Sequence, residues 1–143
     1  GQFTRAGSGV TPSGHNHSQR EPVHFLRIWV VPEERGLAPA YGQRAYDRAA
    51  AARGFELLAS RDGRQGSLQV RQDLDLWLAL LAPGDQRELR LRPGRHAWVH
   101  VARGEATLND RELKAGDGAA VTGEESLRLA GRQAAEVLVF DLA

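Results

Sequence analysis

The second half of the chain is a regular succession of short segments in which apolar and polar residues alternate. Side chains point to opposite faces along a β-strand, so this pattern indicates strands with one buried face. Turn-forming pairs such as Pro83-Gly84, Pro93-Gly94 and Asn109-Asp110 separate the segments at the spacing of a sandwich or barrel. About eight short antiparallel strands suit a jelly-roll barrel, and we predict this all-β fold. The expected strands are Ser67–Arg71, Leu74–Leu81, Arg87–Arg92, His96–Ala102, Ala106–Leu108, Arg111–Lys114, Ala119–Val121, Leu127–Leu129 and Val137–Leu142.

A further strand is expected well before this region, at Val23–Val31. β-Branched and aromatic residues dominate the run, and Pro32 removes a ladder donor directly after it. One face is almost wholly apolar and the other is mixed, so we expect the strand to be covered on both sides. The mixed face holds Phe25, Arg27, Trp29 and Val31, and the apolar face holds His24, Leu26, Ile28 and Val30.

The segments on either side of this run are less regular. Gly1–Arg20 is polar and rich in glycine, and it cannot build a sheet alone. The alanines of Asp47–Arg53 predict a helix of about two turns, with Asp47 as its N-cap and Gly54 as its stop. A brief strand is expected at Phe55–Ala59.

The composition excludes several classes of protein. The 143 residues are enough for one domain with a hydrophobic core, and no apolar run is long enough to span a membrane. The net charge is +1 with the arginines dispersed, which argues against nucleic-acid binding. There is no cysteine, so no disulfide or thiolate ligand can form. No signal peptide is visible, and we expect a cytoplasmic protein.

Several motifs resemble those of a known family. HFLRIWVVPEERGLAPAYGQRAYD (residues 24–47) looks like the signature of the pirin-like bicupins, which include quercetin 2,3-dioxygenase-like proteins. The match continues through SRDGRQGSLQVRQD (residues 60–73) to the closing EVLVFDLA (residues 136–143). The resemblance implies a C-terminal cupin, itself a jelly-roll barrel, at residues 55–143. Residues 1–54 would then be the terminal strands and linker of a first cupin.

The same resemblance implies a metal, and the expected ligands are not in this sequence. The family holds one divalent metal in its first cupin, with two ligands from a His-Ser-Glu motif and two from a His-x-His further upstream. The first motif falls here on Pro12-Ser13-Gly14, where Pro12 and Gly14 offer no side-chain ligand. The second would fall before residue 1. By the general cupin pattern, ligands of the later barrel would fall near Leu91, Pro93, Ala97 and Ala119, none of which binds a metal.

Other histidines offer a weaker metal alternative. His15 and His17 form a literal His-x-His, and His24 is available as a third ligand for iron, nickel, copper, manganese or zinc. Their Gly- and Ser-rich flanks favour a turn. His96 and His100 are about 13 Å apart along their strand and cannot share one metal. We expect the neighbouring Trp98 ring to fill the core; a ring that faces solvent would mean that the strand register is shifted by one residue.

Asp73 and Asp75 are close enough in the sequence to be a candidate acid–base pair. Asp73 and Asp75 share a strand face, and we expect both to face solvent at a sheet edge rather than to line a pocket.

The sequence therefore favours a non-catalytic, metal-free cupin domain with a structural, regulatory or small-molecule-binding role, without identifying the ligand. A metal-dependent oxygenase related to quercetin 2,3-dioxygenase, and a fragment of a longer bicupin enzyme, remain alternatives. Because the apolar side of Val23–Val31 must be covered, we also expect it to fold onto the C-terminal cupin or to form a homodimer.

Overall fold

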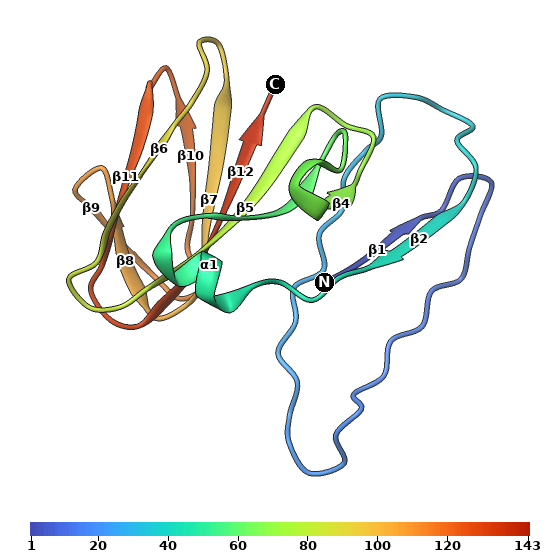
Figure 1. Ribbon diagram of the computed structural model, residues 1–143, viewed down its shortest axis with the longest axis horizontal. Coiled ribbons are helices and arrows are strands. Elements are labelled where there is room, and N and C mark those ends of the chain that lie inside the picture. The colour runs from blue at the N-terminus through green and yellow to red at the C-terminus, as the bar shows by residue number, and fades with distance from the viewer.

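The protein is a two-sheet β-sandwich with one short helix, described here for residues 1–143 from a computed structural model (Figure 1). A six-stranded sheet has the order β10-β7-β12-β5-β3-β4 and faces a four-stranded sheet of order β6-β11-β8-β9. All neighbouring strands are antiparallel except β3 and β4. The strands of the sandwich are β3 (Glu56–Ser60), β4 (Leu68–Gln69), β5 (Leu74–Leu81), β6 (Gln86–Arg90), β7 (His96–Arg103), β8 (Glu105–Leu108), β9 (Arg111–Lys114), β10 (Gly118–Thr122), β11 (Ser126–Gly131) and β12 (Ala135–Leu142). The predicted all-β cupin fold is confirmed, although β4 is shorter than expected.

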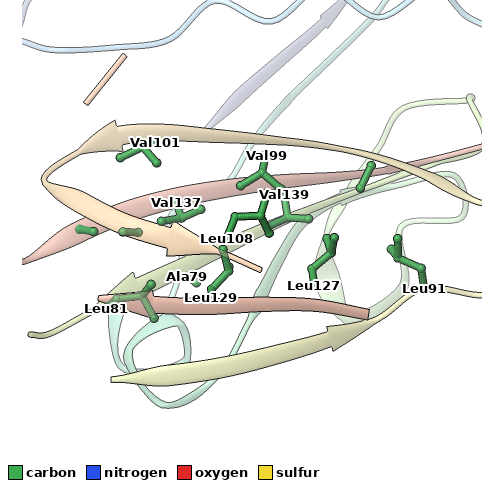
Figure 2. Packing of buried hydrophobic residues seen from close by; sticks show 13 residues of the cluster. Ala79, Leu81, Leu91, Val99, Val101, Leu108, Leu127, Leu129, Val137 and Val139 are labelled. Carbon is green, nitrogen blue, oxygen red and sulfur yellow. The ribbon is translucent and has the colours of Figure 1, made fainter. Parts of the chain in front are cut away.

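The hydrophobic core fills the space between the two sheets. Val99 of β7 and Val137 and Val139 of β12 point from one sheet toward Leu127 and Leu129 of β11 on the other (Figure 2). Each of these five side chains is at most 2% exposed. The alternation seen in the sequence therefore sorts these strands correctly, with every second residue facing inward.

A second apolar layer lies on the outer face of the six-stranded sheet. Leu74, Leu76 and Leu78 of β5 point to this side, and Ala51 of α1 (Arg48–Arg53) and Phe3 pack over them. The sheet is therefore buried on both faces at its centre. The helix begins and ends as predicted. The Asp47 carboxylate accepts hydrogen bonds from the first-turn N–H groups of Ala49 and Ala50, and Gly54 follows the last turn.

The remaining strands form a small separate sheet. β1 (Gln2–Arg5) pairs with β2 (Ala40–Gln43), and between them the chain makes a long excursion away from the sandwich (Figure 1, blue). A 3₁₀ turn at Arg64–Gly66 connects β3 to β4. None of the helices has the length and apolar character that crossing a membrane requires.

The strand expected at Val23–Val31 does not form, and this prediction was wrong. The run belongs to no strand and makes no backbone–backbone hydrogen bond. It is not covered on both sides either, because Trp29 and Val31 are more than three-quarters exposed. The physical reason is that a strand needs a neighbour to receive its hydrogen bonds, and no other segment of the chain lies alongside this one in register. The proposed division at residue 54 stays a prediction.

Candidate functional site

The interior of the barrel is the first place to look, because cupins hold their ligands there. Three of the four positions where the cupin pattern expects ligands face inward. Leu91 and Ala97 belong to the buried core, and Ala119 packs against it. Pro93 instead lies in an exposed turn. The backbone therefore places these positions inside the barrel as in a cupin, but the side chains there are hydrocarbon and cannot bind a metal.

The histidines of the metal alternative lie outside the barrel. His15, His17 and His24 are all exposed, and the His24 Nδ1 lies 3.3 Å from the Nε of Arg103. Across residues 1–143, no three His, Asp or Glu side chains come together in an arrangement that would hold a metal ion. The donors present do not fit the three imidazoles and one carboxylate of a cupin centre.

His96, Trp98 and His100 share the outer face of β7. Trp98 is 43% exposed, so its ring does not fill the core, and the predicted strand register that placed it there was off by one residue. The ring packs over Gly118 of the neighbouring β10, where a Cβ atom would overlap it. His96 Nδ1 is 3.2 Å from the Thr122 hydroxyl. These residues form a half-exposed surface, as expected for the two histidines.

Beside this surface lies an apolar groove of about 450 Å³ on the outer face of the six-stranded sheet. Its floor comes from the ends of β5, β7 and β12, and its wall is the end of the Val23–Val31 run. Nine of its eleven lining residues are hydrophobic, which makes it the most apolar concave surface described here. The main contributors are Ile28, Val30, Leu74, Trp98, Phe140 and Leu142.

Two buried carboxylates face each other at one end of the barrel. Asp75 of β5 lies directly opposite Asp141 of β12 in the antiparallel ladder, and both are 7–8% exposed. Arg95 donates from Nε to Asp141 Oδ1 at 2.6 Å and contacts Asp73 Oδ1 at 2.8 Å. Arg64 NH2 lies 2.5 Å from Asp75 Oδ2. Each carboxylate thus has its own arginine, which offsets the repulsion of like charges on facing strands.

The carboxylate partners raise the pKa values of both arginines. Hydrogen bonding to Asp75 raises the pKa of Arg64, and this outweighs the opposing effect of burial. For Arg95, burial acts to lower the pKa, but hydrogen bonds to Asp141 and Asp73 raise it above its ordinary value. Both guanidinium groups therefore stay charged. Asp75 and Asp141 are each held in an ion pair, so this end of the barrel is a structural ion-pair cluster rather than a catalytic acid–base pair.

The solvent-facing placement predicted for Asp75 was wrong, whereas the Asp73 side chain remains 40% exposed beside Arg95. β5 is an interior strand between β12 and β3, not an edge, and Asp75 points into the barrel. Sequence reasoning also missed Arg95 and Asp141. One signal was available: Asp141 occupies an inward position in the otherwise apolar end of Val137–Leu142, where a carboxylate requires a buried partner.

Comparisons with known proteins identify the family. Residues 57–142 match the family described as the quercetinase C-terminal cupin domain. A quercetin 2,3-dioxygenase of Escherichia coli is 36% identical over 141 residues, covering 99% of this chain and 60% of the relative. A pirin-like protein of Caulobacter vibrioides is 27% identical over 143 residues, covering 99% of this chain and 61% of its own length.

Solved structures give the same result. The crystal structure of YhhW from Escherichia coli has a TM-score of 0.75 and 36% identity, covering 80% of this chain and 48% of that one. A second crystal structure, of the bacterial pirin YhhW from Escherichia coli in complex with nickel(II), has a TM-score of 0.72 and 35% identity, covering 78% of this chain and 47% of that one. The chain spans about 60% of the length of the curated relatives it matches. Its strand order, its inward-facing cupin positions and these similarities together show that the chain belongs to the pirin and quercetinase family and contains that family's C-terminal cupin domain.

Proposed function

We propose that this chain is the scaffold half of a quercetinase-like bicupin, a C-terminal cupin whose barrel is packed rather than catalytic. The observation that carries the proposal is the filling of the barrel interior by thirteen buried hydrophobic residues. Leu91 and Ala97, at two of the expected ligand positions, are among them.

Dioxygenase chemistry makes two demands on a barrel. A redox metal needs imidazole or carboxylate ligands with open coordination positions, and a flavonol needs a cavity beside that metal. Here the side chains at the expected ligand positions are hydrocarbon. At the end of the barrel, the buried carboxylates of Asp75 and Asp141 are bound by Arg64 and Arg95. This arrangement supports stability rather than turnover.

The same proposal assigns a role to the first part of the chain. Residues 1–54 are taken as the end of a first cupin and its linker, and residues 55–143 as the second cupin. Ala51 of α1 and Phe3 cover the outer face of the six-stranded sheet. The linker is therefore attached to the second cupin by apolar packing, which would hold a preceding domain in a fixed position.

Oxygen consumption with quercetin tests the proposal. The purified chain is incubated with iron(II), nickel(II), copper(II), manganese(II) or zinc(II), and the rate is compared with that of each metal alone. The Escherichia coli quercetin 2,3-dioxygenase serves as the positive control. We expect no rate above the metal blank and well under one equivalent of bound metal by elemental analysis. Metal-dependent quercetin cleavage by this chain would refute the proposal.

A second candidate is a metal-dependent oxygenase that uses the exposed histidines of the N-terminal segment. The 36% identity to a protein named quercetin 2,3-dioxygenase favours it. It requires His15, His17 and His24 to assemble around a metal. If the chain does cleave quercetin, replacing these three by alanine must abolish the activity, whereas replacing His96 and His100 by alanine must not.

A further inference from the structure

The turn between β4 and β5 binds the chain on both sides of Pro32. Gln72 Nε2 donates a hydrogen bond to the Val31 carbonyl at 2.7 Å, across 41 positions of the sequence. The Glu33 N–H donates a hydrogen bond to the Arg71 carbonyl at 3.1 Å. Pro32 itself has no N–H, so the turn binds main-chain groups of its two neighbours. The turn therefore recognises the backbone of this segment, whatever its side chains.

The turn is held in the conformation that this contact requires. Arg71 has a φ angle of 51°, a left-handed conformation that residues other than glycine rarely adopt. Its own carbonyl is the group that accepts from Glu33. The Gln72 amide is oriented because its Oε1 accepts from the Asp73 N–H at 2.7 Å, and Asp73 is in turn paired with Arg95 at 2.8 Å. Strained backbone held in place by its surroundings is typical of binding turns.

One side chain adds selectivity to this backbone contact. Arg61 NH2 lies 2.8 Å from the Glu33 carboxylate, with the two side chains 62% and 28% exposed. A pair this exposed contributes little to stability, but it sets which residue of the segment lies against the turn. We call Arg61, Arg71 and Gln72 the linker clamp.

A second anchor holds the same stretch of chain further along. Arg44 NH1 donates to the Leu57 carbonyl at 2.6 Å, and its NH2 donates to the buried carboxylate of Glu56. Glu56 and Leu57 begin β3, and Arg61 directly follows its last residue. About 13 Å of strand separates Leu57 from Arg61. The linker clamp and the Arg44 anchor therefore lie at opposite ends of β3.

We propose that the linker clamp is the surface on which this domain receives the C-terminal end of a preceding cupin, and that with Arg44 it fixes the orientation of that domain. The inference rests on the proposed function, because it takes residues 1–54 as the end of a first cupin. Two separate anchors determine both the position and the direction of the chain between them. The partner is an extended segment with an apolar-Pro-acidic sequence, here Val31-Pro32-Glu33, held through main-chain hydrogen bonds.

Hydrogen exchange of single amides, followed by NMR on the unaltered chain, tests the clamp. We expect the Glu33 amide to have a protection factor at least ~10-fold above that of Glu34, whose N–H makes no backbone hydrogen bond. Gln72→Ala should remove most of this difference. Gln69→Ala, at the exposed glutamine of β4, is the matched control and should leave it unchanged. A Glu33 amide that exchanges as fast as Glu34 in the unaltered chain would overturn the proposal.

Two substitutions of Arg71 separate its backbone from its side chain. Arg71→Gly and Arg71→Val remove the same charge, but glycine adopts positive φ readily whereas a β-branched residue does not. We expect Glu33 protection to persist in Arg71→Gly and to fall at least ~10-fold in Arg71→Val. The Val99 amide, in the central β7–β12 ladder, reports in each variant that the sandwich is folded. Equal loss of Glu33 protection in both variants would contradict a backbone-directed clamp.

A fluorophore between the two anchors tests whether they fix the direction of the chain. Because the chain has no cysteine, Arg35→Cys places a single label on an exposed residue. We expect the label to tumble with the whole molecule in time-resolved anisotropy, and to gain fast local motion when Gln72→Ala is added. A label that is equally mobile with and without Gln72→Ala would overturn the anchoring. The quercetin assay reports on chemistry alone, so a failure of the clamp and a failure of the proposed function are distinguishable.

Discussion

Asp75 and Asp141 lie directly opposite each other across β5 and β12, and both carboxylates are buried at the end of the barrel. The pair is tolerated because Arg64 and Arg95 neutralise one carboxylate each. Arg95 is the more buried of the two arginines, with 8% of its side chain exposed against 40% for Arg64. Its loss should therefore have the larger effect on stability.

Replacing Arg95 by methionine should lower the free energy of unfolding by about 3–5 kcal/mol, because it leaves Asp141 buried and facing Asp75 without its cation. Urea unfolding at pH 7 measures this change. Arg132→Met is the control, since its pair with Glu112 has both side chains more than half exposed, and its loss should cost under ~1 kcal/mol. Equal effects of the two variants would contradict the assignment of Arg95 as a buried anchor.

Truncating a buried leucine should destabilise the protein more than truncating a larger but half-exposed tryptophan. Leu127 is fully buried between the sheets, and Leu127→Ala should cost about 2–5 kcal/mol. Trp98 is larger but half-exposed on the outer face, so Trp98→Ala should cost only about 1–2 kcal/mol. The comparison is made by thermal and urea unfolding of both variants. A larger loss for Trp98→Ala would place its ring in the core and shift the register of β7 by one residue.

Alanine substitutions at two glycines with positive φ should distinguish the cost of backbone strain from the cost of steric clash. Gly104 and Gly116 have φ angles of 73° and 91°. A Cβ at Gly104 would overlap the Ala134 carbonyl oxygen, whereas one at Gly116 meets open space. Gly116→Ala should therefore cost about 1–2 kcal/mol from the left-handed backbone alone. Gly104→Ala should cost roughly 1–3 kcal/mol more because backbone atoms must move. Equal losses in urea unfolding would show that the β12 entry is not in contact with Gly104.

Asp62 should contribute a pH-dependent part of the stability. The Arg64 backbone N–H and the Ser60 hydroxyl hold the pKa of this carboxyl below its ordinary value of 3.8. A carboxyl with a lowered folded-state pKa stabilises the protein above its unfolded pKa, and this contribution is lost as the pH falls through the folded value. The difference in urea midpoint between the unaltered chain and Asp62→Asn should be constant above about pH 5 and shrink toward pH 3. A difference that grows on acidification would contradict these contacts.

Most of the sandwich could be predicted because the information is local. Alternation and turn signals predicted the strands from Leu74 onward, and the Asn109-Asp110 pair predicted a hairpin whose turn residues both have positive φ. The short helix also followed from local chemistry, since Asp47 and Gly54 cap it through contacts within a few residues. The family motifs indicated the same fold.

The site was less predictable because its parts are distant in the sequence. Arg95 and Asp141 are separated by 46 positions, and only the arrangement of β5, β7 and β12 brings them together. The prediction that Asp75 faces solvent requires β5 to be an edge strand, whereas β5 lies between β12 and β3. A sequence pattern shows which residues share a face, but it does not show which strands lie on either side.

The run Val23–Val31 marks the boundary between these two kinds of information most clearly. The sequence by itself determined its strand-like composition, because β-branched and aromatic side chains are the residues enriched in strands. Only the tertiary structure decided that it is not a strand. A ladder requires hydrogen-bonding groups from a second segment, and within this chain no strand of any of the three sheets pairs with the run.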